Sequence, residues 1–157
     1  MEILAKKLGE LLEQRGYKLV TAESCTGGGL AQVVTAIAGS SRWFERGFVT
    51  YSNASKQELL GVKNETLARY GAVSPETAQE MAEGALRHSH AQIAVAITGI
   101  AGPEGGTPLK PVGTVWLAWA EHGQATRSVL KQFAGDRKAI RCEAVRAALE
   151  GLLERLS

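Results

Sequence analysis

Two side chains that could act as nucleophiles are adjacent in the segment Val20-Thr-Ala-Glu-Ser-Cys-Thr-Gly-Gly-Gly29. Ser24 and Cys25 follow an apolar run and precede three glycines, which permit a tight turn from a strand into a helix. At such a junction the first N–H groups of the helix can point into one space. There they bind an anion or stabilise an oxyanion beside a nucleophile. A capped helix start without chemistry fits this segment equally well, so the rest of the chain must distinguish the two interpretations.

A lysine that could act as a base lies at the end of the segment Tyr51-Ser-Asn-Ala-Ser-Lys56. With Ser52 or Asn53 as the cap of a short helix, Lys56 lies in the first turn, where the helix dipole disfavours an ammonium group. A free lysine has a pKa near ~10.4, and a pKa of ~7 requires about 4–5 kcal/mol of destabilisation of the charged form. The helix end supplies about 1 kcal/mol, so burial must supply most of the shift. The alternative is a solvated surface lysine, which composition alone favours.

A second glycine-rich corner, Thr98-Gly-Ile-Ala-Gly-Pro-Glu-Gly-Gly106, follows a continuous apolar run. We expect Thr98 and the backbone N–H groups from Gly99 to Gly102 to hold a ribose or a phosphate, because the glycines allow close approach of the backbone. A plain connection between two strands explains this corner equally well.

The remaining charged candidates are weaker. Arg137 and Arg141 lie in the first turns of the last predicted helix, where a surface role is the default and the guanidinium fork also suits a phosphate. His88-Ser-His90 has no third ligand nearby, so the sequence predicts no metal site. No cofactor is expected.

Apolar periodicity distributes the chain over alternating helices and strands. A stripe of leucines from Leu4 to Leu12 predicts a first helix, and the run Leu30–Ile37 predicts a buried one directly after the glycines. Further helices are expected at 54–60, from 64, from 74 to 88, and from 135 to the end of the chain, and strands at 17–23, 43–52, 91–98, 112–120 and 124–133, the last two joined as a hairpin.

This order of elements predicts an α/β fold in which a mixed sheet is covered by helices on both faces, giving three layers. We expect residues 1–157 to form one domain, since the chain has the length of a single core and no linker or repeat. In such folds sites lie at the carboxyl ends of the strands. The loops 24–29, 51–56 and 98–106 are therefore expected to meet there.

Composition excludes several classes of partner. A formal charge of +2, from 18 basic and 16 acidic residues without a basic stripe, predicts no nucleic-acid binding. No apolar run approaches the ~20 residues of a membrane helix, and no signal peptide is recognisable. Cys25 and Cys142 are too isolated for a disulfide framework. We therefore expect a cytoplasmic protein.

The strings AESCTGG, VTYSNASK-QELLGV, GAVSPETA and AITGIAGPEGG, followed by PVGTV, closely resemble the CinA C-terminal domain family. The resemblance runs from the first helix through Gly135-Asp-Arg137 into the last helix, and the motifs occur in the order of the family. The biochemically defined members are nicotinamide mononucleotide amidohydrolases. Some relatives carry an additional N-terminal domain, and this chain resembles the stand-alone form.

The resemblance implies hydrolysis of an amide without a metal, with nicotinamide mononucleotide as the substrate. Carried onto these positions, Ser24 is the nucleophile, neutral Lys56 the base, and Tyr51 a side chain that relays or holds the proton. Thr26, Gly27 and Gly28 are our candidates for the oxyanion hole. Because neighbouring residues point in different directions, only one of Ser24 and Cys25 can face the substrate, and the resemblance favours Ser24.

Two alternatives to this activity stay open. An amidase acting on another small carboxamide would use the same three side chains. A non-catalytic nucleotide-binding or regulatory module, linked to competence or DNA damage, would need no lysine beside a serine. The resemblance also implies a homodimer or a higher assembly, and the apolar strands between Val112 and Phe133, with two tryptophans, are a candidate surface for it.

Overall fold

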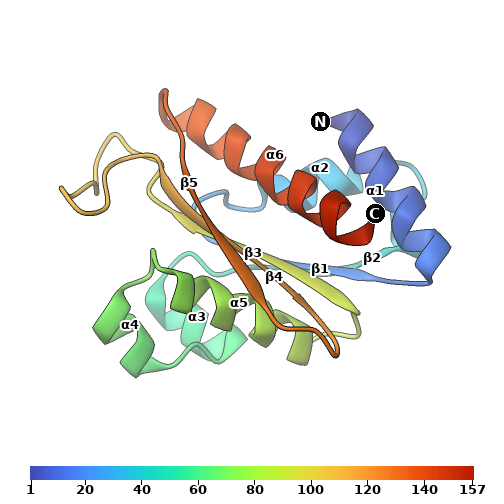
Figure 1. Ribbon diagram of the computed structural model, residues 1–157, viewed down its shortest axis with the longest axis horizontal. Coiled ribbons are helices and arrows are strands. Elements are labelled where there is room, and N and C mark those ends of the chain that lie inside the picture. Colours follow the sequence, from blue (N-terminus) through green and yellow to red (C-terminus); the bar gives the residue numbers. More distant parts are fainter.

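Five strands form one mixed sheet at the centre of the molecule (Figure 1). The computed structural model describes every residue from Met1 to Ser157. Strand β1 lies at the middle of a parallel set, pairing with β2 on one side and β3 on the other, and β4 and β5 continue the sheet in antiparallel fashion. The strands are β1 (Leu19–Glu23), β2 (Phe44–Val49), β3 (Ile93–Gly99), β4 (Thr114–Glu121) and β5 (Arg127–Gln132), in the spatial order β2-β1-β3-β4-β5.

Helices cover both faces of this sheet, so the predicted three-layer α/β class is confirmed (Figure 1). One apolar cluster fills the space between the sheet and the helices α1 (Glu2–Arg15), α2 (Gly29–Thr35) and α6 (Arg137–Leu156). A second cluster fills the space beneath α3 (Asn53–Leu60), α4 (Asn64–Tyr70) and α5 (Pro75–Arg87). Strands β1 and β3 are buried on both faces, as their continuous apolar runs predict. No helix combines the length and the apolar character needed to cross a membrane.

The observed elements differ from the predicted ones mainly at their ends. The predicted strand 43–52 is shortened to β2, Phe44–Val49, because the next two carbonyl groups turn out of the ladder and accept hydrogen bonds from Lys56. Ser52, rather than Asn53, caps α3: its hydroxyl oxygen accepts from the N–H of Ser55 at 3.1 Å. A short 3-10 turn, Ser40–Arg42, precedes β2.

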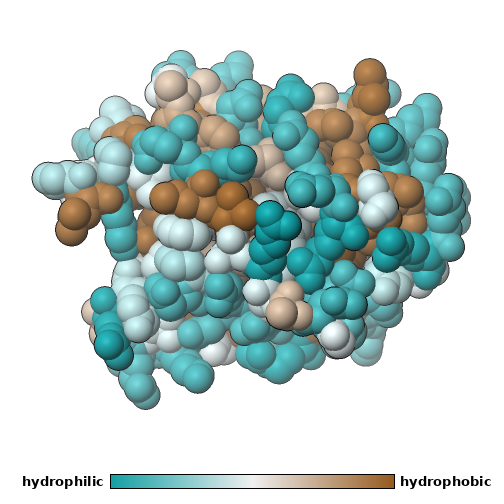
Figure 2. Space-filling view, in the orientation of Figure 1, coloured by the Kyte–Doolittle hydropathy of each residue, from teal (hydrophilic) through white to brown (hydrophobic).

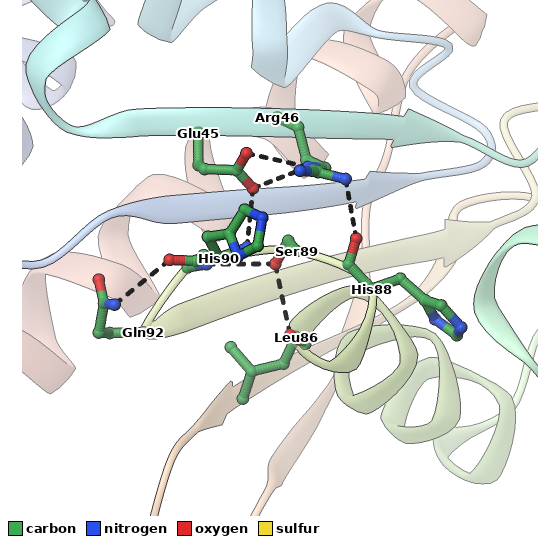
Figure 3. A network of polar contacts seen from close by, with 8 residues as sticks. Glu45, Arg46, Leu86, His88, Ser89, His90 and Gln92 are labelled. Carbon is green, nitrogen blue, oxygen red and sulfur yellow. Dashed lines mark hydrogen bonds and ion pairs between the residues drawn. The ribbon is translucent and has the colours of Figure 1, made fainter.

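The end of the sheet opposite Ser24 is tied together by a polar network, drawn in Figure 3. Glu45 of β2 accepts hydrogen bonds from its neighbour Arg46 and from the backbone N–H of His90, and Arg46 donates to the carbonyl of His88. The network joins β2 to the turn between α5 and β3, and the His88 ring contacts its own helix at the Gly84 carbonyl. No group of three His, Cys, Asp or Glu side chains is placed to hold a metal.

A close approach of α5 to the end of α3 sets the position of the helix that carries Lys56. A Cβ added at Gly84 would overlap the carbonyl oxygen of Leu60, the last residue of α3. Helix propensity favours alanine over glycine by about 1 kcal/mol, so the close contact with α3, and not the helix, accounts for a glycine at this position.

We therefore predict that Gly84→Ala lowers the free energy of unfolding by about 1–3 kcal/mol, because the overlap must displace α3. Urea unfolding followed by circular dichroism measures the change. The exposed Arg87→Ala, one turn further along α5, is the matched control and should change stability by less than about 0.5 kcal/mol. A Gly84→Ala protein more stable than wild type would show that the two helices do not depend on this contact.

Candidate active site

The three predicted loops meet at the carboxyl edge of the parallel strands, around a cavity of about 270 Å³. This volume is just below the range of about 300–1,000 Å³ that is typical of small-molecule sites. Its lining includes side chains from all three loops and from the start of α6, among them Ser24, Cys25, Tyr51, Lys56, Thr98 and Arg137. A cavity of about 290 Å³ between β4, β5 and α6 is lined by no serine, cysteine or histidine, so the chemistry belongs to the first cavity.

The amino group of Lys56 is buried directly against Ser24. The lysine side chain is 1% exposed, and its Nζ lies 3.0 Å from the Oγ of Ser24. The carbonyl oxygens of Thr50 and Tyr51 lie 2.8 and 3.3 Å from the same nitrogen. A neutral amine has two N–H groups and one lone pair. Because the two carbonyls can only accept, they take both N–H groups, and the lone pair is left for the hydroxyl hydrogen of Ser24.

Burial lowers the pKa of Lys56 from 10.5 to about 8, against an opposing contribution from the nearby Cys25. A lysine with a pKa of about 8 is neutral in roughly one molecule in ten at pH 7, against about one in a few thousand for a free lysine. Desolvation penalises the ammonium form, and no carboxylate pairs with it. The sequence predicted that burial, rather than the helix end, would lower the pKa of Lys56, and burial is the cause found in the structure.

Tyr51 contributes to the site mainly through its backbone. Its side chain is 61% exposed at the rim of the cavity, and its hydroxyl accepts a hydrogen bond from Arg137 at 3.2 Å. The hydroxyl makes no hydrogen bond to Ser24 or Lys56, whereas the carbonyl of Tyr51 accepts from Lys56. A proton relay through the phenol would therefore require the side chain to turn inward.

The glycine-rich corner after β1 leaves several N–H groups without a protein acceptor. Gly27 and Gly28 have φ values of 58° and 100°, a left-handed conformation that favours glycine and reverses the chain before α2. The N–H of Gly27 donates to the carbonyl of Ser24 at 3.0 Å, so it is not a free donor. The N–H groups of Cys25, Thr26 and Gly28 donate to no protein group and are the donors this corner can offer.

Glu23, the residue before Ser24, organises this corner and was missed from the sequence. Its carboxylate is 1% exposed and accepts hydrogen bonds from the hydroxyl of Thr26 and the N–H groups of Leu30 and Ala31, at 2.7, 2.8 and 3.0 Å. It therefore caps α2 from outside the helix, where a negative charge is favoured. An acidic residue ending an otherwise buried strand was the available signal, since a buried carboxylate requires several donors.

The second glycine-rich corner lies across the cavity from the first. Thr98 and Gly99 line the cavity, although the Thr98 hydroxyl donates to the carbonyl of Ala72 at 2.8 Å and is therefore already engaged. A Cβ at Gly99 would press on Val115 of the neighbouring strand, which explains a glycine there. Gly102 has a φ of 77°, and its carbonyl accepts from Arg137.

The two arginines of α6 have different surroundings. Arg137 lines the cavity, and its guanidinium spans the loops by donating to the Gly102 carbonyl at 2.8 Å and to the Tyr51 hydroxyl. Arg141 is not part of the cavity lining. Its Nε and Nη2 donate to the carbonyls of Cys25 and Thr26, both at 3.1 Å.

Cys25 lies beside Ser24 and is a poor candidate for a nucleophile. Burial raises the pKa of its thiol from 9.0 to about 11, so the reactive thiolate is scarce near neutral pH. Its side chain, 6% exposed, belongs to the apolar cluster beneath α2 and α6. Ser24, in contrast, contacts the lysine on the other side of β1.

Fold and site together define an α/β protein with a buried serine–lysine pair at the carboxyl edge of a mixed sheet. More specifically, the chain belongs to the CinA C-terminal domain family, which it matches over residues 1–156. It is 53% identical over 151 residues to the nicotinamide-nucleotide amidohydrolase PncC of Pseudomonas putida, covering 96% of this chain and 94% of that protein. The protein of the same name from Escherichia coli (strain K12) is 53% identical over 149 residues, 95% of this chain and 90% of the relative.

Solved structures agree with this assignment. The crystal structure of the competence/damage inducible protein CihA from Agrobacterium tumefaciens superposes with a TM-score of 0.95 at 47% sequence identity, covering 98% of this chain and 93% of that one. The resemblance stated from the motifs is thereby confirmed for the family.

The buried lysine makes stability depend on pH in a predictable direction. Its pKa is about 8 in the folded protein and 10.5 ordinarily, so the unfolded chain binds more protons between these values. We predict that the free energy of unfolding of wild type rises relative to Lys56→Met as the pH increases from about 8 to about 10.5, by up to about 3 kcal/mol. Urea unfolding of both proteins at several pH values measures the difference, in which groups common to both cancel. Parallel pH dependences would contradict a perturbed Lys56.

Proposed function

We propose that this chain hydrolyses the carboxamide of nicotinamide mononucleotide, giving nicotinic acid mononucleotide and ammonia. The observation that carries the proposal is the contact of 3.0 Å between Lys56 Nζ and Ser24 Oγ inside a cavity at the carboxyl edge of the sheet. A hydroxyl nucleophile needs an adjacent base, and a desolvated lysine can supply one. The relatives from Pseudomonas putida and Escherichia coli, which share 53% of their residues with it, are named for this substrate class.

In the proposed mechanism, Ser24 Oγ attacks the carboxamide carbon while neutral Lys56 accepts the hydroxyl proton. The N–H groups of Thr26 and Gly28, with that of Cys25, are the donors available to the oxyanion. Lys56 then returns the proton to the amide nitrogen, the C–N bond breaks, and ammonia leaves. Water, deprotonated by Lys56, attacks the resulting ester and releases the acid and the free serine. Lys56 and backbone donors thus supply the base and the charge stabilisation, so the proposal requires no metal and no cofactor.

The nucleotide part of the substrate would extend from the serine toward α6. Arg137 is the one arginine that lines the cavity, and its guanidinium is fixed across the two loops. We assign it to the phosphate, which a planar guanidinium binds in bidentate fashion. The backbone of Gly99 to Gly102 would face the ribose, and Tyr51 would hold Arg137 and, through its carbonyl, Lys56.

Assembly and location stay predictions. Of the two tryptophans between Val112 and Phe133, Trp119 is 5% exposed and packs in the core, and Trp116 is partly buried against the second apolar cluster. Within that surface, self-association is supported by β5, an edge strand of the sheet whose Leu130 is 50% exposed. Figure 2 shows apolar and hydrophilic side chains side by side on this face, and apolar atoms at the tip of the loop that projects at left. We retain a homo-oligomer and a cytoplasmic location as proposals.

The first test is ammonia release from nicotinamide mononucleotide in the presence of EDTA. We expect wild type to be active, with kcat/KM rising with pH toward a plateau above about 8, because neutral Lys56 is the base. Ser24→Ala and Lys56→Met should each lower kcat by at least about 10³-fold, whereas Cys25→Ala should retain activity. Activity of Ser24→Ala that is lost in Cys25→Ala would move the nucleophile by one residue. An inert wild type that still binds the nucleotide would favour the regulatory module.

A second test concerns the phosphate. Arg137→Gln should lower kcat/KM for the nucleotide by about 10–100-fold, mainly through KM, because a charged hydrogen-bonding partner of the phosphate is lost. The dephosphorylated nucleoside should be hydrolysed equally by wild type and variant. The neighbouring Lys138→Gln, on an exposed residue outside the cavity, is the control. An equal loss with both substrates would show that Arg137 does not recognise the phosphate.

A further inference from the structure

One guanidinium holds two successive carbonyl groups of the loop that follows the nucleophile. Arg141 Nε donates to the carbonyl of Cys25 and Nη2 to the carbonyl of Thr26, both at 3.1 Å. The guanidinium is planar and its donors have a fixed spacing, so the two contacts fix the orientation of both peptide groups. Arg141 does not line the cavity, whereas Ser24 and Cys25 do, so the loop stands between this guanidinium and the cavity.

The orientation of a carbonyl determines where the N–H of the same peptide points. In a trans peptide the C=O and N–H groups point in opposite directions. The carbonyl of Cys25 points to Arg141, so the N–H of Thr26, on the far side of that peptide, points away from the guanidinium. This N–H has no protein acceptor. The N–H of Gly27, which belongs to the second held peptide, donates to the Ser24 carbonyl and closes the turn.

The carboxylate of Glu23 engages other hydrogen-bond donors near this loop. The buried carboxylate of Glu23 accepts from the hydroxyl of Thr26 and from the N–H groups of Leu30 and Ala31, so the first turn of α2 is directed to Glu23 rather than to the cavity. The Thr26 hydroxyl is also engaged there. The backbone N–H of Thr26 thus has no protein acceptor and directly follows Cys25, which lines the cavity, while the Thr26 side chain is held by Glu23.

A positive charge on the carbonyl also strengthens the N–H of the same peptide as a donor, since hydrogen bonds in a chain polarise one another. Charge develops on the substrate oxygen only in the transition state of acyl transfer, and a donor aimed there in advance stabilises it. Arg141 can therefore influence the reaction without touching the substrate.

We propose that Arg141 is a positioning residue: it orients and polarises the Cys25–Thr26 peptide so that the N–H of Thr26 stabilises the oxyanion formed on the carboxamide. This inference rests on the proposed amidohydrolase activity. It replaces the expectation that Arg141 contacts the substrate phosphate, because its contacts are to the loop and Arg137 occupies the cavity.

The test compares nicotinamide mononucleotide with its thioamide analogue, in which sulfur replaces the carboxamide oxygen. Sulfur is a weak hydrogen-bond acceptor, so the ratio of kcat for the amide to kcat for the thioamide reports on the oxyanion donors. We expect Arg141→Gln to lower kcat on the amide by about 10–100-fold, to leave KM within about twofold, and to reduce the amide-to-thioamide ratio by about tenfold. Arg141→Lys, which keeps the charge but not the fork, should lie between wild type and Arg141→Gln.

The matched control is Arg146→Gln on the same helix, where the arginine is half-exposed and forms only a long ion pair of 3.9 Å with Glu143. It should leave both the rate and the ratio unchanged. If Arg141→Gln does not fold, as judged by circular dichroism, Arg141→Lys decides. An unchanged ratio in a folded Arg141 variant, or a rise in KM alone, overturns the inference and leaves the deamidase standing. An inert wild type overturns the proposed function, and this inference with it.

Discussion

The burial of the Lys56 amino group against Ser24 is the interaction on which the rest of the site depends. Removing an ammonium from water is costly unless a counter-charge accompanies it, and no carboxylate contacts this one. The protein instead surrounds the nitrogen with two carbonyl oxygens and one hydroxyl, a set that satisfies the neutral amine completely. The pKa of about 8 follows from the burial of this nitrogen, which penalises the charged form. Burial of this amine therefore lowers the free energy of unfolding near neutral pH, as expected where function and stability compete.

The topology of the sheet explains how this burial is achieved. Parallel strands β1 and β2 end at the same edge, so Ser24 at the end of β1 and the carbonyls of Thr50 and Tyr51 after β2 lie next to one another. The cap at Ser52 then starts α3 immediately, and Lys56 returns in the first turn to the strand ends it has just left. The loop after β3 closes the cavity from the other side. Three chain segments distant in sequence are thus brought together by strand pairing and by the start of α3 at Ser52.

The sequence predicted those parts of the fold and site that depend on local pattern. Apolar runs identified the strands, cap and glycine signals located the helix starts, and the edge where the loops meet followed from strand direction. The role of Glu23 was signalled by an acidic residue at the end of a buried strand, but its partners in α2 were not. The role of Arg141 could not be predicted, because it depends on which carbonyl groups the side chain reaches more than a hundred residues away in the sequence. Gly27 is a similar case. Its glycine predicts the turn, but the sequence does not show that its N–H donates to the Ser24 carbonyl and closes that turn.

Two opposite charges, Glu23 and Arg141, contact the loop that follows Ser24. Glu23 accepts from the Thr26 hydroxyl in the loop and from N–H groups in the first turn of α2, whereas Arg141 donates to two carbonyls of the loop itself. A direct ion pair between them would satisfy both charges but leave the loop free to rotate its peptides. Pairing each charge with backbone instead satisfies the charges and orients the loop at once, which an oxyanion site requires, because its donors must be aligned before charge develops. One buried carboxylate and one half-buried guanidinium thus hold the loop and the helix start that follow Ser24.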